Sequence, residues 1–137
     1  MNIKKGDHIA FRGAFGLPNL YHHGLYVGDN RVVHFSGADN NLKLDASVNI
    51  VSLDQFKKLA RLRGSPLYLV LHKKSLPVDE RVNRCLLLVG NKNYNLFTNN
   101  CEHVISECVT GKRASQQLDS FFGLVKTVGD LQYIVID

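Results

Sequence analysis

The segment Gly24–Phe35, GLYVGDNRVVHF, constrains the possible folds of this chain more than any other. It contains two short β-rich runs joined by Gly28-Asp29-Asn30, and residues of these types readily adopt the backbone angles of a tight hairpin turn. Upstream, the alternating run His8–Arg12 has strand character, and a loop rich in Gly and Pro leads from it towards the hairpin. Together these runs predict an antiparallel β-meander in the first half of the chain.

The second half mixes helical and strand patterns. We expect helices at 52–62, where Ser52 is a plausible N-cap, at 77–90, with Pro77 in the first turn and Gly90 as C-cap, and at 101–109. The apolar run 67–72 predicts a central strand buried on both faces, and the chain closes with a β-like run at 133–136. The 137 residues suit one compact domain. The expected fold is a single α+β domain over 1–137, with an antiparallel sheet packed against helices.

Composition narrows the functional classes. Seventeen Lys and Arg against twelve Asp and Glu give a net charge of +5, but the basic residues occur in pairs and not in long runs, so no specific nucleic-acid binding is expected. The chain shows no signal-peptide pattern, and its apolar runs are far shorter than the roughly 20 residues of a membrane span. An odd number of cysteines, three, favours reduced thiols and a cytoplasmic location. No Gly-rich phosphate loop or dinucleotide fingerprint appears, so no cofactor is expected.

Cys101 differs from the other two cysteines in its sequence context. Cys85 and Cys108 fall on apolar faces of expected helices and are interpreted as small buried hydrophobic residues. Cys101 lies at the expected start of a helix, where unpaired backbone N–H groups and the helix dipole favour a thiolate. The sequence therefore predicts that Cys101 is a nucleophile.

A thiol nucleophile needs a base, and the candidates are the six histidines: His8, His22, His23, His34, His72 and His103. Side chains alternate along a strand, so only one of the adjacent pair His22 and His23 can face the site. His34, on the partner strand, can fix the tautomer of the base. We expect the remaining three, at positions 8, 72 and 103, to be polar surface or turn residues.

Two other interpretations of these residues are weaker. Glu102, next to the nucleophile, could be taken for the acid of a catalytic triad. On a helix, however, it projects about 100° away from Cys101, so we expect a first-turn carboxylate favoured by the helix dipole. The side chains of His22, His34 and Cys101 could in principle form a three-ligand zinc site, but a cysteine at a helix N-terminus suits a nucleophile better. We therefore expect no metal.

The motif HHGLYVGDNRVVHF, followed by NNCEHV, is similar to motifs of the lecithin:retinol acyltransferase-like family, a circularly permuted branch of the papain-like NlpC superfamily. In that family an H-box supplies the base, a second histidine follows twelve residues later, and an Asn-Cys (NC) motif carries the nucleophile. Counting twelve residues back from His34 selects His22 as the base. The resemblance covers most of residues 3–118 and implies a permuted, NlpC-type papain-like fold.

The resemblance also implies a reaction: acyl transfer or phospholipase A-type hydrolysis of a phospholipid or other acyl ester through a thioester on Cys101. His22 would move the proton, His34 would orient His22, and a backbone N–H near the cysteine, helped by the hydroxyl of Tyr26, would stabilise the oxyanion. Two alternatives remain open. One is a nonstructural protein of the small-RNA-virus type, which shares both motifs and acts through a host partner without acyltransferase activity; the other is a papain-like cysteine peptidase.

Membrane contact is expected to be peripheral. Vertebrate members of the family carry an apolar anchor after this domain, whereas this chain ends in LQYIVID, so constitutive anchoring is not expected. The loop GAFGLPNLY offers four apolar or aromatic side chains as an interfacial contact: Phe15, Leu17, Leu20 and Tyr21.

Overall fold

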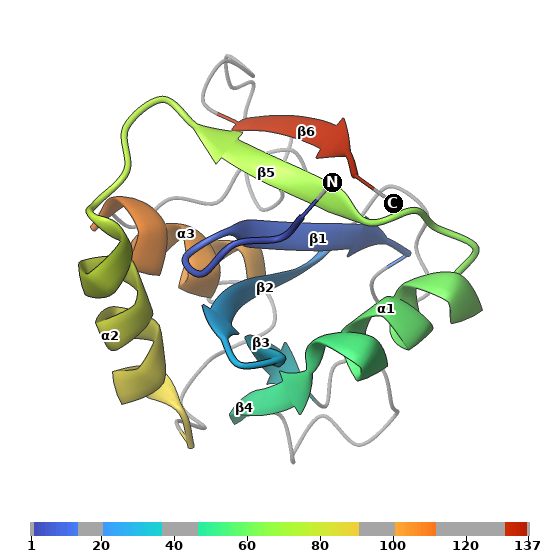
Figure 1. Cartoon of the computed structure of the whole chain (residues 1–137), viewed down its shortest axis with the longest axis horizontal. Helices are drawn as coiled ribbons and strands as arrows, with labels where there is room; N and C mark the ends of the chain where they lie inside the picture. The colour runs from blue at the N-terminus through green and yellow to red at the C-terminus, as the bar shows by residue number, and fades with distance from the viewer. Residues whose placement is uncertain (1, 14–20, 37–46, 91–100, 112–130, 137) are drawn as a thin grey trace.

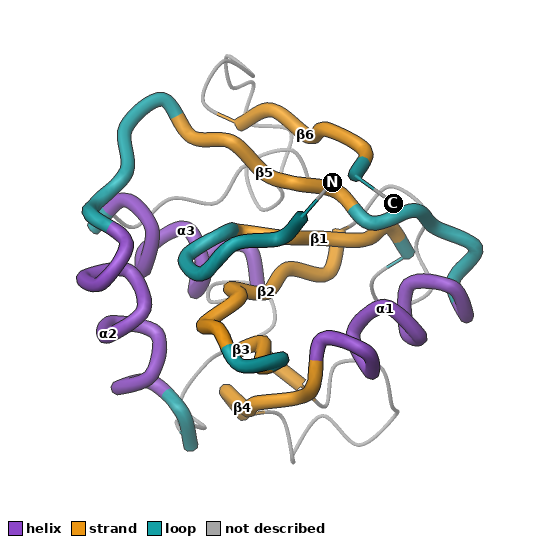
Figure 2. Tube along the Cα trace, in the orientation of Figure 1, coloured by secondary structure: helices purple, strands orange, loops and turns teal. Residues whose placement is uncertain are grey.

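The computed structural model describes residues 2–13, 21–36, 47–90, 101–111 and 131–136, and for 101–104 it describes the helix but not the side chains. The strands are β1 (His8–Arg12), β2 (Tyr21–Gly28), β3 (Arg31–Ser36), β4 (Ser47–Ser52), β5 (Tyr68–His72) and β6 (Leu131–Val135). The helices are α1 (Leu53–Leu62), α2 (Val78–Leu88) and α3 (Cys101–Thr110) (Figures 1 and 2). The expected α+β fold is confirmed.

The strands form one six-stranded antiparallel sheet in the order β4-β3-β2-β1-β5-β6. Strands β1 to β3 pair with their neighbours in sequence, which confirms the predicted meander. At the β2–β3 turn, Asp29 and Asn30 both have positive φ angles, 54° and 59°. Such angles match the right-handed twist of the two flanking strands, so this turn fixes the hairpin register.

Strand β4 was not predicted, because its polar residues, SVNIVS, mask the alternation of an edge strand. It pairs with β3 from Arg31↔Ser52 to Ser36↔Ser47 and leads directly into α1. The expectation that the run 67–72 is buried on both faces was wrong. Strand β5 does lie between β1 and β6, but Val70 is its only buried residue, and Leu71 on the other face is 38% exposed. An apolar run alone does not reveal which strand faces a helix covers.

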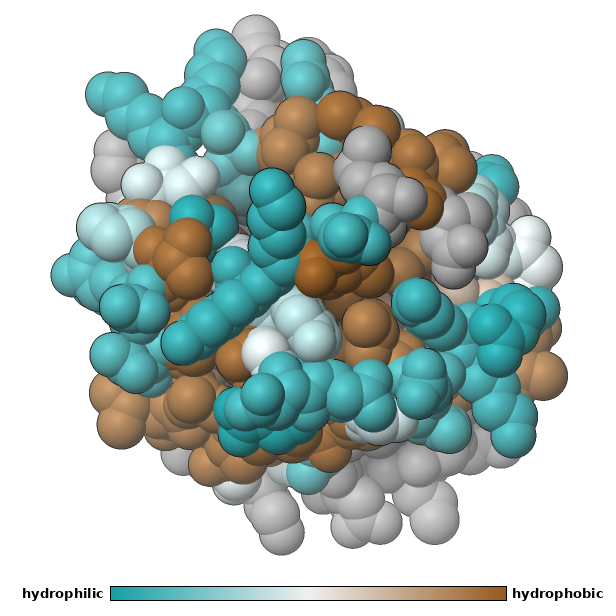
Figure 3. Space-filling view, in the orientation of Figure 1, coloured by the Kyte–Doolittle hydropathy of each residue, from teal (hydrophilic) through white to brown (hydrophobic). Residues whose placement is uncertain are grey.

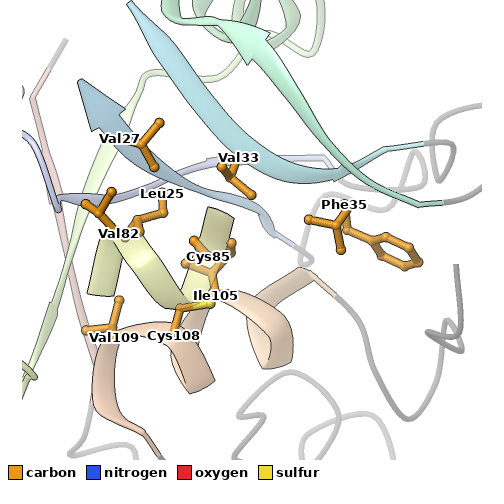
Figure 4. Packing of buried hydrophobic residues seen from close by; sticks show 10 residues of the cluster. Leu25, Val27, Val33, Phe35, Val82, Cys85, Ile105, Cys108 and Val109 are labelled. Carbon is orange, nitrogen blue, oxygen red and sulfur yellow. The ribbon is translucent and has the colours of Figure 1, made fainter. Parts of the chain in front are cut away.

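Helices cover both faces of the sheet. Helices α2 and α3 pack against one face, where their buried residues meet Leu25 of β2 and Val33 of β3 (Figure 4). Helix α1 packs against the opposite face, where Phe56 meets Phe11 of β1 and Val32 of β3. The neighbours Val32 and Val33 thus belong to different cores, as the alternation of a strand requires. Every side chain of the sheet can therefore be assigned to the α1 face or to the α2/α3 face.

The helix ends follow the sequence signals. The Ser52 hydroxyl accepts a 3.0 Å hydrogen bond from the backbone N–H of Gln55, so this residue is the predicted N-cap of α1, a bond worth about 1 kcal/mol. Pro77 precedes the first residue of α2, and Gly90 has a φ of 92° just beyond its end. Cys101 is the first residue of α3, as predicted.

Some apolar side chains reach the surface. Leu71 of β5 and Ile134 of β6, 41% exposed, lie on the same face of the sheet. Figure 3 shows a hydrophobic area over this region, bordered by hydrophilic residues. Among the described residues, no helix has the length and apolar character needed to cross a bilayer.

Candidate active site

Two of the predicted site residues, His22 and His34, form a buried pair on the α1 face. Gly24 pairs with His34 across β2 and β3, so His22 is its diagonal neighbour on the same face. Nε2 of His22 lies 2.8 Å from Nδ1 of His34, and the two rings meet edge to face at 81°. The exposed fractions are 1% and 3%. The hairpin register, and therefore the turn at residues 28–30, brings this pair together.

Aromatic rings surround the pair and exclude water. The ring of His22 lies 5.0 Å from Phe11 and 5.8 Å from Phe56, and the ring of His34 lies 6.1 Å from Phe56. Burial lowers the pKa of His22 to about 4, and the positive charge of Arg63 adds to this effect. His22 is therefore a neutral imidazole near pH 7.

The tautomer of His22 decides whether it can act as a base. Between its Nε2 and Nδ1 of His34 there is one shared hydrogen. If Nε2 of His22 donates that hydrogen, Nδ1 of His22 keeps its lone pair. Among the described residues, no hydrogen-bond partner reaches this buried Nδ1. In that tautomer, His34 orients His22 and leaves a desolvated proton acceptor.

The described part of α3 packs on the other face of the sheet. Ile105 and Cys108 belong to the cluster around Leu25, whose side chain points away from the face of His22. The side chain of Cys101 lies outside the described residues, so its pairing with His22 stays a prediction. Of the two adjacent histidines of β2, the one that shares a face with α3 is His23.

A second histidine cluster lies on this α2/α3 face, and the sequence interpretation missed it. Nε2 of His8 is 2.7 Å from Nδ1 of His23, and Nδ1 of His8 is 2.7 Å from Nε2 of His72. The expectation that His8 is a polar surface residue was wrong, because it is 2% exposed, and His72 is only half-buried. The β1–β2 register and the parity of His23 were the signals that could have revealed this cluster.

The remaining predicted residues occupy separate places. The hydroxyl of Tyr26 accepts a 3.1 Å hydrogen bond from the backbone N–H of Asn30, at the hairpin end of β2. Its Cα lies four residues, about 13 Å, beyond that of His22 along the strand. Tyr21 of the expected lipid loop stacks on Tyr133 with a centroid distance of 4.2 Å, whereas Phe15, Leu17 and Leu20 lie outside the described residues. Cys85 and Cys108 are buried, as predicted.

Residues 1–114 match the family described as lecithin retinol acyltransferase, and because the match covers well over half of the chain, the protein belongs to that family.

The chain is similar to two kinds of curated protein within that family. It is 30% identical to human lecithin retinol acyltransferase over 132 residues, covering 80% of this chain and 57% of the relative. The bovine protein of the same name matches to the same extent. Human phospholipase A and acyltransferase 1 is 27% identical over 121 residues, covering 81% of this chain and 72% of the relative. The chain therefore spans little more than half the length of the first of these relatives.

Proposed function

We propose that this protein is an acyltransferase or phospholipase A-type hydrolase that cleaves a lipid acyl ester through a thioester on Cys101. The observation that carries the proposal is the desolvated His22–His34 pair, with its 2.8 Å ring contact, in a chain whose relatives are named acyltransferases and a phospholipase A. The order of the two motifs, histidine hairpin and then a cysteine that begins a helix, supports the same assignment.

The position of Cys101 supports its role as nucleophile. It is the first residue of a ten-residue helix, where backbone N–H groups lack intrahelical partners and the dipole is positive. Both effects favour a thiolate over a thiol. The same N–H groups can donate to an oxyanion that forms on the carbonyl under attack.

In the proposed reaction, Nδ1 of His22 takes the thiol proton, and Sγ of Cys101 attacks the ester carbonyl to form a C–S bond. The ester C–O bond then breaks as His22 returns the proton to the leaving alkoxide. Water or another acceptor cleaves the thioester by the same steps in reverse order. The hydroxyl of Tyr26 lies at the hairpin end of β2, where it accepts a hydrogen bond from Asn30, so we assign the oxyanion contact to the backbone N–H groups at the start of α3.

The low pKa of His22, about 4, limits how the thiol proton of Cys101 can pass to the imidazole. A thiol with an ordinary pKa near 8.5 would hardly protonate so weak a base, unless thiolate and imidazolium formed together as an ion pair. The helix N-terminus stabilises the thiolate, and His34 can accept a hydrogen bond from the imidazolium. The proposed role of His22 therefore depends on a thiolate–imidazolium ion pair with Cys101.

The proposed substrate is a phospholipid presented at a membrane surface. Leu71 and Ile134 are exposed on the same face of the sheet, and Lys73 and Lys74 follow Leu71 closely in the chain, so apolar contact and positive charge occur together. We propose peripheral membrane contact on these grounds.

Intact-protein mass spectrometry after incubation with short-chain phosphatidylcholine vesicles tests the proposal. We expect an acyl-sized mass gain in the wild type, none in Cys101→Ala, and a much slower gain in His22→Ala. Leu87→Ala is the control, because this side chain on α2 is 85% exposed and lies outside both histidine clusters. The mass gain of the control should equal that of the wild type.

The same experiment separates the alternatives. A wild type without an adduct, whose Cys101 nevertheless reacts readily with iodoacetamide, would contradict lipid-ester chemistry. That result would favour a cysteine peptidase or a protein that acts by binding a host partner. An adduct that forms equally well in Cys101→Ala would contradict the thioester.

A further inference from the structure

The histidine cluster on the α2/α3 face has no role in the reaction proposed above. It consists of His23 on β2, His8 on β1 and His72 on β5, three neighbouring strands in the middle of the sheet. Both ring nitrogens of His8 are engaged, one by each of the other two rings, at 2.7 Å. The hydroxyl of Tyr133 on β6 lies 3.4 Å from Nε2 of His23. The three imidazoles therefore form a continuous hydrogen-bonded chain.

The strand register builds this chain. His8 pairs with Leu25 on one side and with Val70 on the other. His23 lies two residues before Leu25, and His72 lies two residues after Val70, so both are diagonal neighbours of His8 on the same face. Side chains as long as imidazole bridge such diagonal positions. The chain thus crosses the sheet from a buried end at His23 to a half-buried end at His72.

The arrangement is linear, which argues against a metal site. Metal ligands converge on one point, whereas the two nitrogens of His8 point to different neighbours. Among the described residues, no group of three or more metal-ligating side chains is placed to hold an ion. An imidazole carries one N–H and one lone pair, so a row of them can pass a hydrogen-bonded proton along its length.

We propose that His23, His8 and His72 form a proton relay that connects acyl-transfer chemistry on the α3 side of the sheet with the protein surface. This inference rests on the proposed function in taking Cys101 as the nucleophile. His23 shares the face of Leu25, against which Ile105 of α3 packs, and Cys101 begins the same helix. Hydrolysis of an ester near pH 7 releases one proton per turnover, because the acid product ionises, and that proton must leave the site.

The relay step balances without any other reactant. A proton is taken up at Nε2 of His23, and its Nδ1 proton passes to Nε2 of His8. The Nδ1 proton of His8 then passes to Nε2 of His72, and His72 releases the proton of its own Nδ1 to the surface. One proton has moved, and each ring has changed tautomer. Burial, followed by the neighbouring His23 and His72, lowers the pKa of His8 well below its usual value, so its resting form is the neutral ring that this step needs.

Histidine side-chain ¹⁵N NMR of the full chain, without substrate, tests the coupling. We expect His72→Gln to change the tautomer signature of His23, which contacts the other ring nitrogen of His8, because the effect passes through the His8 ring. His34→Gln is the matched control: it removes one ring from the other pair and should leave the His23 signature unchanged. A His23 signature identical in the wild type and His72→Gln would overturn the relay.

The kinetics of thioester formation and of turnover test whether the relay carries protons during the reaction. We expect His72→Ala, at a half-buried site that tolerates truncation, to slow turnover on phosphatidylcholine vesicles on the order of tenfold, and added free imidazole to restore the rate. A merely structural role would not respond to imidazole. Normal turnover by His72→Ala would overturn the relay and leave the proposed function intact. A wild type that forms no acyl adduct would overturn the proposed function and, with it, the use of the relay.

Discussion

His22 and His23 are consecutive residues of β2, yet they belong to separate buried hydrogen-bonded systems on opposite faces of the sheet. His22 pairs with His34 beside α1, and His23 joins His8 on the side of α2 and α3. The alternation of side chains along a strand separates them completely. Two adjacent imidazoles can therefore serve different proton transfers without competing for the same partner.

A comparison of His22→Gln with His23→Gln should show which of them serves Cys101 directly. We expect the rate of acyl-adduct formation to fall about 100-fold in His22→Gln, the loss typical of a missing general base. In His23→Gln, where only the relay is interrupted, turnover should fall about tenfold. Mass spectrometry of the adduct over time gives both rates. The reverse order of the two losses would identify His23 as the base and contradict the assignment to His22.

Acid should destabilise the protein through His22. Its folded-state pKa, about 4, lies below the ordinary value of 6.5, so the unfolded state binds this proton at higher pH than the folded state. The associated stability is complete above pH 6.5 and is lost as the pH falls towards 4, by roughly 3 kcal/mol at most. Urea unfolding at several pH values within this window measures the loss.

His22→Gln is the control for this pH dependence. The substitution removes one titrating group, so the free energy of unfolding should fall less steeply with acid than in the wild type. The pKa of His8 is also lowered, so some pH dependence should remain. Equal slopes in the two proteins would contradict the buried, neutral state of His22.

Gly24 should not tolerate alanine, because it lies in β2 directly opposite His34 on the crowded α1 face. A Cβ at this position would meet Cγ1 of Val32 at 2.6 Å and Cε1 of Phe56 at 3.1 Å. Overpacking of this kind costs about 1–3 kcal/mol. The double variant Gly24→Ala/Val32→Ala should recover part of the loss relative to the sum of the single changes, because the nearest clash is gone. Strict additivity in urea denaturation would locate the strain elsewhere.

The sequence predicted the elements that depend on local signals. The hairpin turn, the Ser52 cap and the start of α3 at Cys101 each follow from a short motif. Strand parity showed that only one of His22 and His23 can face the site, and the family resemblance selected His22. The chain His23–His8–His72 could not be predicted in the same way. It depends on the register between β1 and its two neighbours, and β5 is more than fifty residues away in sequence. A strand pattern also does not show which face of the sheet a helix will cover. The packing of α3 on the face opposite His22 could therefore be seen only in the structure.

Cys85 and Cys108 should be unreactive towards thiol reagents in the folded protein. Cys85 and Cys108 are buried in the contact between α2 and α3, and the hydrogen bond that the Cys85 thiol makes with Cys108, together with burial, raises the pKa of Cys85 well above its usual value. With iodoacetamide near pH 7 we expect one carbamidomethyl group, on Cys101, and three after unfolding in urea. Peptide mapping assigns the sites. Native-state labelling of Cys85 would show that α2 and α3 separate readily.

Anchoring of α3 to the sheet should depend on Ile105. This side chain is 0% exposed and packs in the cluster with Leu25 and Cys85, so Ile105→Ala removes buried methyl groups where the surrounding strands cannot close the gap. We expect a loss of about 2–5 kcal/mol in the free energy of unfolding, against less than about 0.5 kcal/mol for Leu87→Ala on the exposed side of α2. If the rate of acyl-adduct formation in Ile105→Ala falls by more than the fraction of folded protein does, the position of α3 controls the nucleophile. If the two fall in parallel, Ile105 contributes to stability alone, and the placement of Cys101 depends on the residues that precede the helix.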